Sequence, residues 1–128
     1  MSRLVVIIIR KKLTGYIKNI NEDTLENISS NAIITKDKIT YINNNIKHVI
    51  HIKNNELILI RETNEFKNIL TFSIKRSILS EYIIKKEDLC LEINIKTLEL
   101  SITDKIIYIK YLILDSNTIY EYKLFLEE

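Results

Sequence analysis

The segment IKHVIHIKNNELILIR, residues 46–61, is the clearest indication of the fold. Its first half places side chains of one face at every second position, namely Ile46, His48, Ile50 and Ile52, which is the period of a half-buried strand. Asn54 and Asn55 follow, and asparagine accepts positive φ better than other residues with a Cβ. Residues 56–61 then resume the alternation. The segment therefore predicts two antiparallel strands joined by a tight hairpin.

The same period continues on both sides of this hairpin. It predicts strands over residues 4–9, 25–35, 39–42, 46–52, 56–61, 70–74, 89–95, 98–102, 106–114 and 118–126. In the first of these, Val5, Ile7 and Ile9 share one face, and the alternation of residues 70–74 continues in the same phase to residue 84. No proline interrupts them, and the best helical candidate is 21–28, where Asn21 would cap a first turn. Residues 1–128 are thus expected to form one all-β domain of about 8–10 short antiparallel strands with little or no helix. A sandwich and a barrel both fit, and only a barrel hides every strand edge.

Charge and cysteine content restrict the partners and the compartment. The 19 basic and 17 acidic residues give a net charge of +2, which is too balanced to indicate nucleic acid or an anionic membrane. No apolar stretch approaches the roughly 20 residues that span a bilayer. The single cysteine, Cys90, cannot form an intramolecular disulfide, so we expect a reducing, cytoplasmic location and a semi-buried rather than reactive thiol.

A basic cluster precedes the first acidic residue, Glu22, and consists of Arg3, Arg10, Lys11, Lys12 and Lys18. Only Tyr16 lies among these residues, whereas proteins that bind single strands use several aromatic stacking platforms. The cluster is therefore read as a solvated strand end, and nucleic-acid binding is not favoured.

Glycine content argues against several enzyme classes. Gly15 is the only glycine, so the sequence has no Walker loop, dinucleotide fingerprint or nucleophile elbow. His48 and His51 have an odd spacing that sends them to opposite faces of one strand, so they do not form a shared metal site. The sequence predicts no catalytic residue, metal or cofactor, and an enzyme is not favoured.

Four residues are candidates for ligand binding. Arg61 and Arg76 continue the apolar faces of residues 57–59 and 72–74, and an inward guanidinium needs a carboxylate, carbonyl or anionic ligand. The simpler interpretation is that both arginines reach water from strand ends. Tyr82 and Tyr111 also point inward by alternation, either as core tyrosines or as groups that line a cavity.

A family resemblance rests on residues 32–126. It is carried by AIITKDKITYI (32–42), ELILIRETNEF (56–66), LTFSIKRSILSEY (70–82), LCLEINIKTLELSI (89–102), IIYIKYLIL (106–114) and YEYKLFL (120–126). In this order of strands the chain resembles the YwiB-like family of uncharacterised bacterial proteins, whose fold is a calycin-like, or lipocalin-like, β-barrel. The family's glycine is replaced here by Ser30 and Asn31, and its turn with threonine, an aromatic and glycine by residues 84–87. The resemblance implies the fold and no activity.

The sequence does not identify the biochemical activity. We expect a small ligand bound in or at the mouth of the barrel, because small barrels can enclose one small molecule. The alternative is a non-enzymatic interaction or scaffold protein that forms a homo-oligomer through the doubly apolar strand 106–114.

Overall fold

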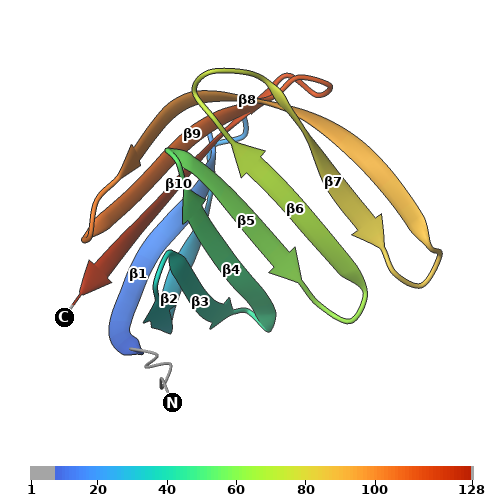
Figure 1. Cartoon of the computed structure of the whole chain (residues 1–128). Helices are drawn as coiled ribbons and strands as arrows, with labels where there is room; N and C mark the ends of the chain where they lie inside the picture. The colour runs from blue at the N-terminus through green and yellow to red at the C-terminus, as the bar shows by residue number, and fades with distance from the viewer. Residues whose placement is uncertain (1–7, 128) are drawn as a thin grey trace, which may run out of the picture.

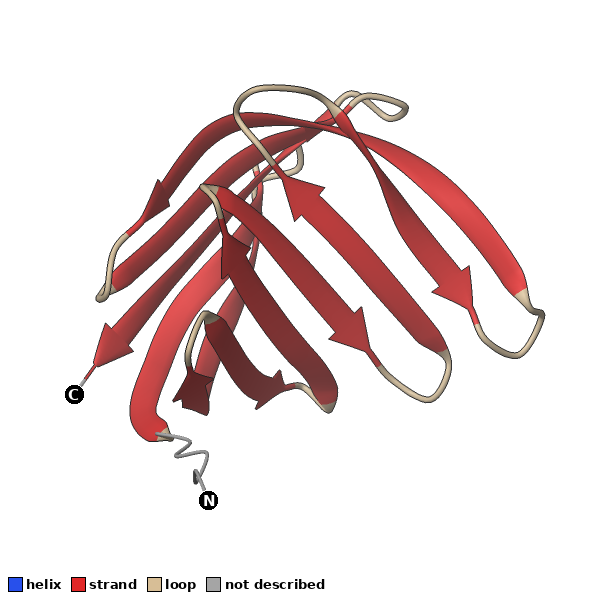
Figure 2. Ribbon diagram, viewed as in Figure 1, coloured by secondary structure: helices blue, strands red, loops and turns tan. Residues whose placement is uncertain are grey.

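A computed structural model describes residues 8–127, which form ten antiparallel strands and no helix (Figures 1 and 2). The strands are β1 (Ile9–Asn19), β2 (Thr24–Thr35), β3 (Lys38–Asn43), β4 (Ile46–Lys53), β5 (Glu56–Glu62), β6 (Phe66–Phe72), β7 (Ile78–Ile84), β8 (Leu89–Ile102), β9 (Ile106–Ile113) and β10 (Thr118–Glu127). No helix in this part of the chain is long and apolar enough to cross a membrane.

The strands close into one barrel in the order β1-β10-β9-β8-β7-β6-β5-β4-β3-β2. Every strand therefore lies beside its neighbours in the chain, and only the pairing of β1 with β10 joins distant segments. Figure 1 shows the blue strand β1 and the red strand β10 side by side. The prediction of an all-β antiparallel barrel is confirmed, and a sandwich is excluded.

Tight asparagine turns connect two of the hairpins. Asn54 and Asn55 have φ of 51° and 63°, and Asn44 and Asn45 have φ of 52° and 62°. Two consecutive positive φ values define the turn whose twist matches that of paired strands. The hairpin predicted at residues 46–61 is therefore present, with a second turn of the same kind before it.

The first two strands differ from their prediction. Val5 and Ile7 lie outside the described residues, and β1 runs from Ile9 to Asn19. Arg10 and Lys11 pair only with β2, whereas Lys12 and Lys18 pair with both β2 and β10. Arg10 and Lys12 are exposed, which agrees with a solvated strand end for this part of the basic cluster. The helical candidate at 21–28 is wrong, because β2 begins at Thr24 and pairs with β1 from there. Continuous pairing along β1 outweighs the weak preference of one short helical turn.

Two irregularities change which side chains face inward in the second half. Residues 89–95 and 98–102 form one strand, β8, in which a bulge at Leu98 moves the inward phase from Ile95 to Leu100. Strand β6 ends at Phe72, so Ile74 lies in a loop and is 56% exposed. Cys90 on β8 is exposed rather than semi-buried.

Side-chain hydrogen bonds close the barrel where backbone pairing is short. Strand β6 pairs with β7 only over residues 66–69. Beyond them, the backbone N–H of Thr71 donates to Ser80 Oγ (3.1 Å) and that of Ser73 donates to Thr97 Oγ1 (3.0 Å). Between β2 and β3, which pair over only three residues, Ser30 Oγ donates to the Ile42 carbonyl (2.7 Å). Polar side chains thus satisfy backbone groups that a gap in the sheet would leave without partners.

Apolar and aromatic side chains fill the middle of the barrel. The largest fully buried ones come from all around the sheet: Leu13, Tyr41, Ile50, Leu57, Leu59, Phe72, Ile95, Ile107, Ile109, Tyr122 and Leu124. The middle of the interior is therefore a packed core.

The glycine at position 15 sets how closely β1 approaches β10. A Cβ at this position would overlap the backbone carbonyl oxygen of Lys123 and lie 3.1 Å from the Cα of Leu124. Because both contacts are with backbone, no side-chain rotation relieves them.

We expect Gly15→Ala to lower the free energy of unfolding by about 1–3 kcal/mol, the usual cost of overpacking a well-packed site. Thr14→Ala on the same strand is the matched control and should change stability by less. Urea unfolding of both variants measures the difference, and equal stabilities would contradict the close approach at Gly15.

Candidate ligand site

A row of polar side chains crosses four neighbouring strands on the inside of the barrel. His48 on β4 is paired with Arg61 on β5, Arg61 with Asn68 on β6, and Asn68 with Tyr82 on β7. Side chains opposite one another on paired strands lie on the same face within contact distance. The four residues come from hairpins that the sequence specifies separately, and the strand register brings them together.

Arg61 and His48 form the best-defined contact in this row. Arg61 Nε donates to His48 Nε2 at 3.2 Å, and His48 Nδ1 lies 3.0 Å from the Ile46 carbonyl oxygen. Arginine can only donate, so His48 Nε2 must accept this hydrogen bond and carries no proton. His48 is therefore neutral, and its single ring proton lies on Nδ1 and is donated to the Ile46 carbonyl oxygen. Burial, with a smaller effect from the nearby Arg61 charge, lowers the pKa of His48 to about 4.

Two tyrosines extend this contact across the core. The Tyr41 ring stacks on His48 with ring centroids 4.4 Å apart, and the Tyr41 and Tyr122 hydroxyls are hydrogen-bonded to each other. Burial raises the pKa of both hydroxyls well above the usual range, so both stay protonated at neutral pH. The neutral His48 and these tyrosines leave Arg61 as the charged member of the group.

A cavity of about 170 Å³ opens beside Arg61. It is lined by Ile17, Leu59, Arg61, Asn68, Leu70, Ile93, Tyr111, Ile113, Tyr120 and Tyr122. The set combines aliphatic walls with one guanidinium, one amide and three phenol rings. A concave apolar site with a few convergent polar groups is typical of small-molecule binding sites.

Polar groups at this cavity lack protein partners. Asn68 is only 9% exposed, and its Oδ1 has no hydrogen bond within the described chain. No carboxylate among residues 8–127 forms an ion pair with Arg61. Arg61 is half-buried and keeps its hydrogen bond from Nε to His48. Buried polar groups normally have partners, so the Asn68 oxygen beside this guanidinium marks the cavity as a place where a ligand or solvent would bind.

The structure brings together two of the four residues predicted to bind a ligand. Arg61 and Tyr111 both line the cavity, and Tyr111 packs against Phe72 and Tyr120 at centroid distances of 4.8 and 5.5 Å. Arg61 thus points inward, although the simpler interpretation placed it in water. Tyr82 belongs to the same polar row, stacks on Phe66 at 5.7 Å, and does not line the cavity.

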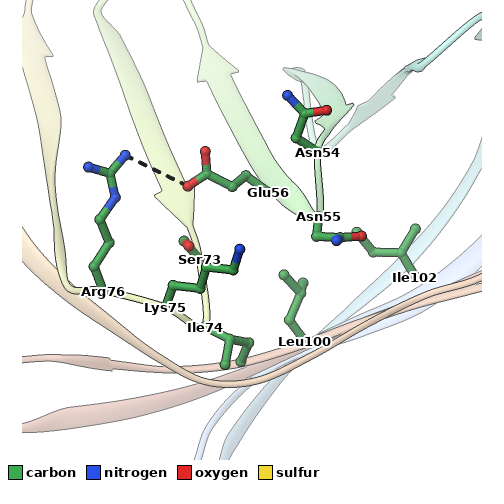
Figure 3. A pocket seen from close by; sticks show the side chains of 9 residues that line it. All are labelled: Asn54, Asn55, Glu56, Ser73, Ile74, Lys75, Arg76, Leu100 and Ile102. Carbon is green, nitrogen blue, oxygen red and sulfur yellow. Dashed lines mark ion pairs between the residues drawn. The ribbon is translucent and has the colours of Figure 1, made fainter.

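Arg76 lies elsewhere, at the opposite end of the barrel. The expectation that it continues an inward face is wrong, because the loop after Phe72 breaks the alternation. Its side chain is 71% exposed, and its Nη2 lies 3.9 Å from Glu56 Oε2. Figure 3 shows the two side chains as an ion pair. The cleft there, about 490 Å³, is lined by Asn54, Asn55, Glu56, Ser73, Ile74, Lys75, Arg76, Leu100 and Ile102. Lys75 and Arg76 at this cleft are exposed, and none of the described residues that line it has a buried side-chain polar atom without a partner like Asn68 Oδ1.

Sequence reasoning missed Asn68, Tyr41, Tyr120 and Tyr122 as members of the site. Asn68 had a usable signal, since it occupies the inward phase of Leu70 and Phe72 despite being polar. The three tyrosines had no usable signal in the sequence, because inward-facing tyrosines are common in ordinary protein cores. His51 faces away from the buried His48, as their spacing predicts.

Comparisons with known proteins support the fold alone. No protein-family model matches this sequence, and no curated protein matches it. Among solved structures, the chain is similar to the crystal structure of the ywiB protein from Bacillus subtilis, with 14% sequence identity. The match covers 95% of this chain and 92% of that chain with a TM-score of 0.62. The two proteins share a β-barrel architecture over nearly their whole lengths.

The buried neutral His48 predicts a loss of stability in mild acid. Its pKa of about 4 lies below the value of 6.5 for a free histidine, so between these values the unfolded chain binds the extra proton. The free energy of unfolding should therefore fall by about 2 kcal/mol between pH 7 and 4.5 through this group. Urea unfolding at several pH values should show this loss in the wild type and a flatter profile in His48→Gln. If the wild type and His48→Gln lost the same stability in acid, the assignment of a buried, neutral His48 would be contradicted.

Proposed function

We propose that this protein binds a small molecule in the cavity beside Arg61. The observation that carries the proposal is the convergence on one cavity of a guanidinium without a carboxylate and an amide oxygen without a partner. Leaving the Asn68 oxygen buried and unsatisfied costs free energy that a bound ligand would recover. At about 170 Å³ the cavity suits a ligand smaller than most drug-sized molecules.

The barrel also supports a finer classification. We infer that it is of the calycin-like type and belongs with the YwiB-like bacterial proteins, which the strand motifs resemble and whose fold is similar over 95% of this chain. We further propose a cytoplasmic location, because Cys90 is an exposed free thiol and such thiols persist in reducing compartments.

Self-association is a second proposal with a specific surface. Strand β9 buries Ile107, Ile109 and Tyr111 inside the barrel. Apart from Lys110, its outward side chains are also apolar or aromatic, among them Ile106, which is 36% exposed. An apolar outer face suits a second copy of the chain. This surface is separate from the cavity, so the two proposals are independent.

Native mass spectrometry of gently purified protein tests both proposals. We expect an excess mass that disappears on denaturation, present in the wild type and in Arg76→Met but lost in Arg61→Met. Arg76 is the matched control because it lies outside the cavity on the opposite end. A wild-type mass without excess after purification, together with no binding in small-molecule screens, would contradict ligand binding. The charge-state series reports the subunit count, and a monomer at every concentration would contradict self-association.

A further inference from the structure

The cavity beside Arg61 carries one positive charge and no negative one. Arg61 is the only charged side chain among the residues that line it. His48 adds no charge, because its Nε2 accepts a hydrogen bond from Arg61 Nε and must carry a lone pair there. Burial raises the pKa of the Tyr111 and Tyr122 hydroxyls, so these two groups stay neutral at physiological pH. A ligand with a single negative charge would therefore balance the site.

Arg61 is held in a defined orientation. Its Nε is bonded to His48, and His48 is in turn fixed by the Ile46 carbonyl and by stacking on Tyr41. The two terminal nitrogens of the guanidinium form no ion pair with any described carboxylate. A planar guanidinium whose terminal N–H groups are available matches a carboxylate, which accepts two parallel hydrogen bonds.

The neighbouring amide fits the same group. Asn68 is the cross-strand partner of Arg61 on β6, lines the cavity, and is nine-tenths buried with an unpartnered oxygen. Rotation of its amide presents an N–H to a carboxylate held by Arg61. With the amide turned in this way, Arg61 and Asn68 on adjacent strands both offer donors to one carboxylate.

The rest of the cavity is apolar and small. Aliphatic side chains form its remaining walls together with aromatic rings: Ile17, Leu59, Leu70, Ile93, Ile113, Tyr111 and Tyr120. About 170 Å³ corresponds to five or six water molecules at roughly 30 Å³ each. A short hydrocarbon tail fits this space, whereas a second charge would lack a partner in it.

The geometry points to a short monocarboxylic acid with an apolar tail as the ligand class, its carboxylate on Arg61 and Asn68 and its tail among the aliphatic walls. This inference rests on the proposed function and narrows it. It excludes from tight binding anions without an apolar tail, such as inorganic phosphate, and neutral ligands, such as the corresponding amides.

Three probes of known chemistry test the inference: hexanoate, hexanamide and inorganic phosphate. Each is titrated into the full chain at neutral pH by isothermal calorimetry, while the side-chain Nε–H resonance of Arg61 is followed by NMR. We expect hexanoate to bind roughly ten-fold or more tightly than hexanamide, as loss of a charged hydrogen bond predicts, and to shift the Arg61 resonance. Arg61→Met should abolish this preference, and Arg76→Met should keep it.

Other outcomes separate this inference from the proposed function. If hexanamide binds as tightly as hexanoate and perturbs cavity residues, the cavity binds small molecules and the carboxylate class is wrong. Tighter binding of phosphate than of hexanoate also overturns the class. If no probe binds at millimolar concentration and native mass spectra carry no excess mass, both the class and the proposed function are wrong. The comparison of the three probes on the wild type does not depend on how well a variant folds.

Discussion

Closure of the sheet between β1 and β10 is the constraint on which the rest of the structure depends. Without this pairing, β1 and β10 would each present an edge of unpaired backbone groups, and the inward side chains of ten strands would have no enclosed interior. The only glycine of the sequence lies on this contact, where a Cβ would overlap the Lys123 carbonyl. One residue without a side chain therefore permits the approach that makes the interior, and with it the cavity.

The interior then has to accommodate polar groups among Ile, Leu, Phe and Tyr side chains. Arg61 is compatible with this environment because a neutral histidine accepts from its Nε and because it lines a cavity and is only half-buried. The Tyr41 and Tyr122 hydroxyls satisfy each other in the middle of the barrel. Stability and the candidate site thus use the same residues, with His48 contributing to both.

Alternation in the sequence predicted which side chains face inward more reliably than which side chains meet. The strand 46–53 and the turn at Asn54 and Asn55 were recognisable because their signals are local. The row from His48 to Tyr82 was not recognisable, since it depends on the register of four strands. Arg76 failed for another reason: the loop after Phe72 ends the alternation on which its inward assignment depended. At the bulge the change of phase was visible in the sequence, since Leu100 and Ile102 do pack against the core, and only the bulged Leu98 is exposed.

The order of strands around the barrel also has a kinetic consequence. Nine of the ten pairings join strands that are consecutive in the chain, so they close short loops and form at little entropic cost. The tenth pairing, in which Lys12 meets Glu127, closes a loop that contains almost the whole described chain. We therefore expect the hairpins between consecutive strands to form first during folding. The pairing of the first and last strands, which closes the barrel, is then expected as a single late step.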